Sequence, residues 1–198
     1  MKRLYIFLAF ALLTFYNYSC KPKDKVVIDY KEVLHQNQDE LTQVIIYDVF
    51  TPPVAARIYA YTSLASYEAI RFITPGNPSL AENMKGIGKL PLPDSSKKYD
   101  FTLAATQAFF TMAYKVTFSI DTLKAYQGPL MEKFKMALHD SVYNRSIAFG
   151  DSIGKAILAW SAKDHYFESR GKKKYLGSNA PGKWRPTAPD YSDGVEWC

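Results

Sequence analysis

Apolar residues recur every three to four positions along most of residues 30–160, which is the spacing of one face of an α-helix. Breaks in this pattern predict five helices, over residues 30–50, 51–72, 100–117, 119–138 and 140–160. No stretch alternates apolar and polar side chains as a half-buried strand would. The sequence therefore predicts an all-α bundle of about five helices, followed by an irregular basic C-terminal tail.

Capping residues and prolines set the expected helix boundaries. Thr51 precedes Pro52 and Pro53, and proline is tolerated in a first turn because its missing N–H has no partner there. Gly128-Pro129 is expected to kink or split the fourth helix. The residues expected to begin the later helices are Tyr99 or Asp100, Ser119 or Asp121, and Asp140 or Ser141.

Two segments interrupt the helical pattern. Residues 79–99 form a connection rich in Gly, Pro and Lys. Its segment 86–89, Gly-Ile-Gly-Lys, lacks the spacing and the following Ser or Thr of a phosphate-binding loop, so we expect an ordinary loop. The pattern ends again at Asp164, where an irregular tail with several prolines begins.

Composition indicates a folded core and one basic segment. Hydrophobic residues make up 47% and aromatic residues 15% of the chain, which is enough to fill a core. The net charge is +6, but residues 163–185 alone carry seven Lys or Arg and a balance of +5. Because the positive charge is concentrated in this one segment, we expect no nucleic-acid-binding surface spread over the protein. We interpret the run 170–174 as a solvated loop; the alternative is attraction of an anionic substrate or of lipid headgroups.

Residues 1–19 have the organisation of a bacterial export signal. Lys2 and Arg3 give a basic start, residues 4–16 are an apolar run, and Ser19 precedes Cys20. The run is shorter than the roughly 20 apolar residues of a membrane-spanning helix. The Ser-Cys ending resembles the lipobox of bacterial lipoproteins, in which the cysteine is acylated, although Asn17 stands where an aliphatic residue is usual.

We therefore predict lipidation at Cys20, a tether over residues 20–29 and a helical domain over residues 30–198. The protein is expected in the cell envelope, at the periplasmic or outer-membrane face, with the membrane as its partner through the anchor. An ordinary secreted protein and an uncleaved membrane anchor are the alternatives. The chain has two cysteines, Cys20 and Cys198. Because a lipidated Cys20 has no free thiol, we expect neither a disulfide nor a thiolate metal site.

Charged residues on apolar helix faces are the candidates for a polar site, because a buried charge needs a partner. Arg57, Tyr61, Leu64 and Glu68 share one stripe of the second helix, and Asp48 lies on the apolar side of the first. One interpretation is a functional site between helices. The interpretation that we favour is structural ion pairing, such as Asp48 with Arg57.

The remaining candidates have structural interpretations. His35, His139 and His165 are isolated, and none has the i, i+4 spacing of a helical metal pair, so we interpret them as surface or capping residues. Gly150 and Gly154 lie one turn apart. We expect these glycines to permit close approach of two helices rather than dimerisation in a membrane.

Two stretches carry a resemblance to a known family. They are residues 51–70, TPPVAARIYAYTSLASYEAI, and residues 181–191, PGKWRPTAPDY, with Val195-Glu196 just after. Both resemble the N-terminal half of bacterial lipoproteins of the phosphatidic acid phosphatase and vanadium haloperoxidase superfamily. Residues 160–164 lie between them in the expected order, and the resemblance covers nearly the whole chain after residue 19. It implies an all-helical fold that binds phosphate or vanadate.

The catalytic pattern of that superfamily is a Lys followed by Arg-Pro, then Pro-Ser-Gly-His, then Ser-Arg and a second His. It implies that cations neutralise an oxyanion, while a histidine attacks it or ligates vanadate. Here Arg185-Pro186 is present, but Ser178 stands where the Lys would be, and no histidine follows His165. No catalytic, cofactor-binding or metal residue is therefore assigned in this chain, and no cofactor is expected on it.

The chain stops at Trp197-Cys198, where the family pattern continues into a catalytic half. We interpret the sequence as the N-terminal half of a haloperoxidase-like or phosphatase-like lipoprotein, inactive alone or completed by a second polypeptide. The alternative is a complete, non-enzymatic surface lipoprotein that binds a partner or nutrient on a helical scaffold, because resemblance of fold does not decide function.

Overall fold

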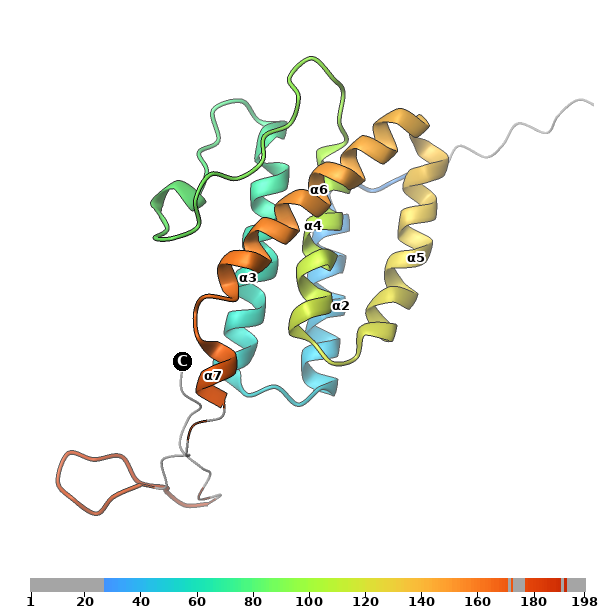
Figure 1. The fold of residues 1–198 in the computed structure, drawn as a ribbon. Coiled ribbons are helices and arrows are strands. Elements are labelled where there is room, and N and C mark those ends of the chain that lie inside the picture. Colours follow the sequence, from blue (N-terminus) through green and yellow to red (C-terminus); the bar gives the residue numbers. More distant parts are fainter. Residues whose placement is uncertain (1–26, 171, 173–176, 190, 192–198) are drawn as a thin grey trace, which may run out of the picture.

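The computed structural model describes residues 27–170, 172, 177–189 and 191, and these residues contain helices and no strand (Figure 1). The prediction of an all-α bundle is confirmed. The helices are α2 (Val33–Tyr47), α3 (Pro52–Ile70), α4 (Phe101–Val116), α5 (Ile120–Ala137), α6 (Asp140–Ser161) and α7 (Tyr166–Arg170), with 3₁₀ turns at Arg71–Ile73 and Ala81–Asn83. None of these helices is long and apolar enough to cross a membrane. The expected signal segment 1–19 and Cys20 lie outside the described residues.

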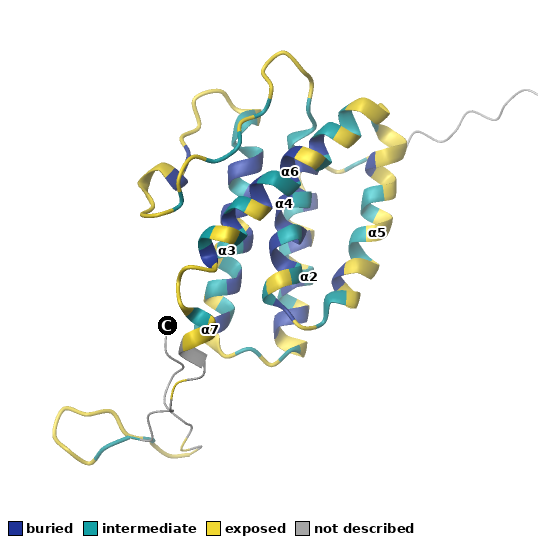
Figure 2. Cartoon of the chain, in the orientation of Figure 1, coloured by how far each residue is buried: buried dark blue, intermediate teal, exposed yellow. Residues whose placement is uncertain are grey.

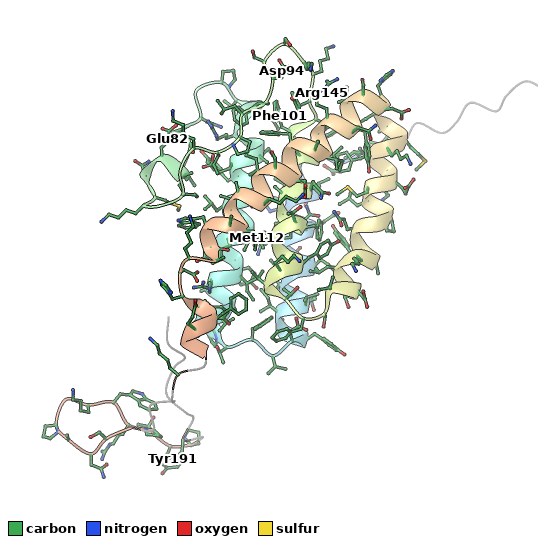
Figure 3. The ribbon with its side chains drawn as sticks, viewed as in Figure 1. Glu82, Asp94, Phe101, Met112, Arg145 and Tyr191 are labelled. Carbon is green, nitrogen blue, oxygen red and sulfur yellow. The ribbon has the colours of Figure 1, made fainter. Side chains whose placement is uncertain are left out.

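Helix α4 is the centre of the bundle. It packs against α6, α3, α2 and α5, and Figure 2 shows it enclosed by them. The apolar spacing of this helix predicts one inward face with Ala104, Ala108, Met112 and Val116; the first three side chains are fully buried, and Val116 is half-buried. The structure also buries most of its other faces. Met112 lies among the helices in the middle of the molecule (Figure 3).

Helices α4 and α6 touch through two glycines. A Cβ added at Gly150 would lie 2.1 Å from the carbonyl oxygen of Ala104, and one at Gly154 would lie 2.7 Å from the Cβ of Thr111. No side chain fits at either position unless the helices move apart. The prediction that these glycines permit close helix packing is confirmed.

A buried carboxylate fixes the long connection between α3 and α4. Glu68 is 1% exposed. It accepts hydrogen bonds of 3.0 Å from the Ser79 hydroxyl and the Ala81 amide, and Arg71 Nε lies 3.1 Å from its Oε2. These contacts neutralise a charge that burial would otherwise disfavour. They hold the start of the connection against α3.

The connection runs alongside α6 and then over one end of the bundle. Trp160 Nε1 donates a 3.0 Å hydrogen bond to the Lys85 carbonyl, and Arg145 donates one of 2.6 Å to the Lys98 carbonyl. Figure 3 shows Asp94, Phe101 and Arg145 at this end. Gly86 and Gly88 have φ values of 81° and 72°, which glycine adopts without strain. The expected loop over residues 86–89 is thus confirmed.

The structure differs from the prediction at the end of α2 and at the start of α6, and it adds α7. The first helix was expected to continue to residue 50, but α2 ends at Tyr47, and Val49 beyond it has a φ of 56° and an 83% exposed side chain. Helix α6 is capped by His139, whose Nδ1 accepts a hydrogen bond from the Ser141 amide, rather than by Asp140 or Ser141. Helix α7 was not predicted, because five residues are too few to show a helical period.

Helix α5 continues through Pro129 and is not split. Proline leaves the carbonyl four residues earlier, that of Ala125, without its helical donor. Ala125 and Pro129 both lie on the exposed side of α5, so water can bind this carbonyl. Thr51 occupies the expected N-cap position of α3, but its side chain makes no capping hydrogen bond.

We expect Gly150→Ala to destabilise the protein by about 1–3 kcal/mol or more, because the new methyl group collides with the α4 backbone. Urea unfolding measures this free energy. Asn144→Ala, at an exposed position of the same helix, is the control and should change stability by no more than about 0.5 kcal/mol. Equal effects of the two substitutions would contradict the proposed contact.

Candidate functional site

The polar stripe of α3 meets the segment that joins α6 to α7. Arg57 forms an ion pair with the carboxylate of Asp164, and the hydroxyl of Tyr61 donates a hydrogen bond to the same carboxylate. Positions 57 and 61 are one turn apart, so both side chains leave α3 on the same side. We call Arg57, Tyr61, Asp164 and Tyr166 the arginine cluster.

Two aromatic rings flank the guanidinium of Arg57. Its central carbon lies 5.0 Å from the centre of the Tyr61 ring and 4.3 Å from that of the Tyr166 ring, within the range of a cation–π contact. Tyr61 also packs edge-on against Trp160, with ring centres 5.6 Å apart. Burial raises the pKa of the Tyr61 phenol, and the nearby Arg57 charge lowers it in part. The phenol therefore remains a hydrogen-bond donor at neutral pH.

Asp164 also begins the last helix. Its Oδ1 accepts a 2.9 Å hydrogen bond from the Tyr166 amide, and His165 between them has a φ of 61°. The side chains of Arg57 and Asp164 are 21% and 24% exposed, so water screens their attraction only partly. One carboxylate thus links α3 to the start of α7.

A cavity of about 100 Å³ lies beside the arginine cluster. Two hydroxyls in its wall are engaged elsewhere, because those of Thr117 and Ser161 each donate a 2.9 Å hydrogen bond to a backbone carbonyl. Lys115 is a second cationic side chain in the wall besides Arg57. The rest of the wall is largely apolar, so the cavity can hold an apolar group beside the ion pair and Lys115. The lining residues are Phe50, Val54, Arg57, Ile58, Tyr61, Lys115, Val116, Thr117, Phe118, Leu158, Ser161, Ala162, Tyr166 and Phe167.

The expected pair of Asp48 with Arg57 was wrong. Asp48 Oδ2 instead accepts hydrogen bonds of 2.8 Å from the Phe118 amide and 3.2 Å from the Ser119 amide, and Oδ1 accepts one from the Ser119 hydroxyl. A carboxylate at this place satisfies donors at the N-terminus of α5 and favours its dipole. Arg57 pairs with Asp164 instead. The sequence analysis did not predict Asp164 as its partner.

The stripe on α3 does not form one site. Glu68 belongs to the separate cluster with Ser79, Ala81 and Arg71, and Leu64 packs in the apolar core. Only Arg57 and Tyr61 reach Asp164. One feature of the sequence pointed to Asp164. It is the last residue of 160–164, which lie in the expected order between the two stretches that carry the family resemblance.

The three histidines lie on different elements. His35 is an exposed residue of α2, His139 caps α6, and Nδ1 of His165 lies 3.8 Å from a carboxylate oxygen of Glu168. The capping interpretation is confirmed for His139. Within the described part of the chain, no three metal-ligating side chains come together.

The second resembling stretch lies apart from the arginine cluster. Residues 177–189 form a loop in which the Ser178 amide donates to the Trp184 carbonyl, and the Lys183 amide to that of Ala180. Figure 3 shows Tyr191 beside this loop, away from the helices. Arg185 lies in the same loop. Lys173 and Lys174 of the basic run lie outside the described residues.

Comparison with solved structures finds a protein with this arrangement of helices. It is described as the first bacterial vanadium-dependent iodoperoxidase, with a TM-score of 0.74 and 32% sequence identity, over 83% of this chain and 40% of that chain. This chain therefore spans about two fifths of the length of the iodoperoxidase. No family model and no curated protein matches. The similarity supports the fold of the vanadium haloperoxidase and phosphatase superfamily for this chain.

We expect the Arg57–Asp164 pair to stabilise the protein by about 0.5–3 kcal/mol in a double-mutant cycle of Arg57→Ala and Asp164→Asn. Urea unfolding of the four proteins measures this coupling. The control cycle is the exposed Lys124–Asp121 pair, whose nitrogen and oxygen lie 3.6 Å apart, and its coupling should be at most about 0.5 kcal/mol. Additive effects at Arg57 and Asp164 would contradict the assigned link.

Proposed function

We propose that this chain supplies the non-catalytic helical scaffold of a haloperoxidase-like or phosphatase-like lipoprotein of the bacterial envelope, and that it is inactive when alone. The observation that carries this proposal is the match to two fifths of a vanadium-dependent iodoperoxidase. The second support is the sequence, which contains no Pro-Ser-Gly-His segment and no histidine after His165.

Vanadate and phosphate are oxyanions, and each needs several converging cationic donors. The arginine cluster does not fit such a group. The charge of Arg57 is compensated by Asp164, and this carboxylate would repel an approaching anion. The adjoining cavity is lined largely by apolar side chains. We therefore assign the cluster a structural role, in which it fixes α7 against α3.

We further propose that Cys20 carries a lipid anchor, which holds the scaffold at the periplasmic or outer-membrane face. The support is the order of basic start, apolar run and Ser19-Cys20 in the sequence. A polar segment, residues 21–25, then separates the cysteine from the helical body.

Growth of expressing cells with a radioactive fatty acid tests the anchor. The native protein should be labelled and should fractionate with membranes, because acylation adds apolar surface that inserts into lipid. Cys20→Ser should lose the label, whereas Cys198→Ser should retain it. Equal labelling of native protein and Cys20→Ser would contradict the assignment.

Turnover assays on purified residues 21–198 test the absence of activity. Aryl phosphate is the substrate in one assay; vanadate, peroxide and bromide or iodide are combined in the other. We expect no turnover above the buffer rate, because charge alone provides neither an attacking nitrogen nor a fixed proton relay. Turnover that persists through repurification and disappears in His165→Ala would contradict the proposal.

A further inference from the structure

Helix α5 is the least buried of the long helices. Two of its 18 residues, Leu123 and Phe134, have buried side chains, whereas ten of the 16 residues of α4 are buried. Helix α5 lies at one side of the bundle (Figure 1), and Figure 2 shows most of it in yellow and teal. Because local stability rises with the number of buried apolar side chains, α5 is the long helix that should open most easily.

The two buried side chains lie near opposite ends of α5. Leu123 belongs to an apolar cluster with residues of α2, α3 and α4. Phe134 forms a smaller cluster with Val33 of α2 and Leu103 of α4, and its ring meets that of Tyr30 edge-on, with ring centres 6.2 Å apart. Positions 123 and 134 are about three helical turns apart. Helix α5 is therefore held to the bundle at two separate points.

Between these two points, α5 meets α4 partly through polar groups. The Tyr114 hydroxyl donates a hydrogen bond to Oε1 of Gln127, and Nε2 of Gln127 donates one of 3.4 Å to Oε1 of Gln107. Gln107 in turn donates a 3.2 Å hydrogen bond to the Thr111 hydroxyl. These groups can bond to water when the helices separate, so they resist separation less than buried apolar side chains would.

The backbone of α5 is weakest at its middle. Glycine has a low helix propensity, and a Cβ added at Gly128 would meet no atom within 4 Å, so packing does not require a glycine there. The next residue, Pro129, cannot donate the helical hydrogen bond to the Ala125 carbonyl. All three residues are exposed. Loss of helical structure would therefore begin most easily at this point.

The connections of α5 determine how it can open. Three residues, 117–119, join it to α4, and two residues, 138–139, join it to α6. The first connection is held in addition by Asp48, which accepts hydrogen bonds from the Phe118 and Ser119 amides. Because both connections are short, α5 cannot move far from the bundle as an intact helix. It can separate from the bundle by unwinding.

The other long helices keep contacts that do not include α5. Gly150 and Gly154 place α6 directly on α4. The apolar cluster that contains Ile153 and Ile157 of α6 has its other buried members on α3 and α4. These contacts would remain when α5 unwinds.

We propose that α5 is a separate unfolding unit of the bundle, which unwinds from Gly128-Pro129 and detaches from α4 while α3, α4 and α6 stay packed. The unwinding uncovers the side of α4 that carries Gln107 and Tyr114. The fold thus contains a conformational device that makes one side of its central helix accessible, and this opening requires neither the lipid anchor nor a partner.

Native-state hydrogen exchange of the purified protein, read by mass spectrometry of peptides from each helix, tests this device. Amides of α5 should have protection factors at least about tenfold lower than amides in the middle of α4 and α6. Their exchange should also depend less on low concentrations of urea, because unwinding of one helix exposes less surface than global unfolding does. Equal protection and equal urea dependence in α4, α5 and α6 would overturn the proposal.

Two mild variants distinguish unwinding of α5 from global unfolding. Ile157→Val removes one methylene group from the cluster of α3, α4 and α6. It should speed exchange in the middle of α4 by about two- to tenfold and leave that of α5 unchanged. Gly128→Ala favours the helical state of α5 without a new contact, and it should slow exchange in α5 by about two- to fivefold. Equal acceleration of α4 and α5 by the first variant, or unchanged exchange of α5 in the second, would contradict a separate unfolding unit.

Discussion

The direct contact of α6 with the backbone of α4 is the constraint on which the rest of the bundle depends. At Gly150 and Gly154 no side chain separates the two helices, so α6 lies across α4 at close range. The remaining faces of α4 are then available to α3, α2 and α5. This arrangement explains why small residues of α4 such as Ala104, Ala105 and Ala108 are fully buried. Close-packed interiors tolerate little change in such contacts.

Asp164 has a comparable role at the end of α6. Its carboxylate binds Arg57 and Tyr61 of α3 and the Tyr166 amide, and so determines the direction in which the chain leaves α6. Because α7 is held in this way, Phe167 is placed in the same cavity wall as Phe118. The ion pair therefore shapes a surface as well as joining two helices.

The electrostatics of the site agree better with packing than with binding of an oxyanion. The Arg57 charge is compensated by Asp164 and covered by aromatic rings, so it attracts an anion only weakly. The largely apolar cavity beside it contributes one further cation, Lys115, whereas an oxyanion needs several converging cationic donors. The similarity to the iodoperoxidase extends over two fifths of that protein, which is consistent with our proposal that this chain is a scaffold.

Features that arise from local geometry could be predicted from the amino-acid sequence. Helical periodicity gave the five main helices, Thr51-Pro52-Pro53 the start of α3, and the spacing of Gly150 and Gly154 their packing role. The partners of the charges depend on the tertiary structure, because Asp48 accepts a hydrogen bond from the Ser119 amide 71 positions away and Tyr61 meets a carboxylate 103 positions away. Folding also sets the central position of α4 and lets α5 continue through Pro129, which lies on the exposed side of that helix. Periodicity reflects neighbours along the chain, whereas ion pairs, all-round burial and solvation depend on residues that folding brings together.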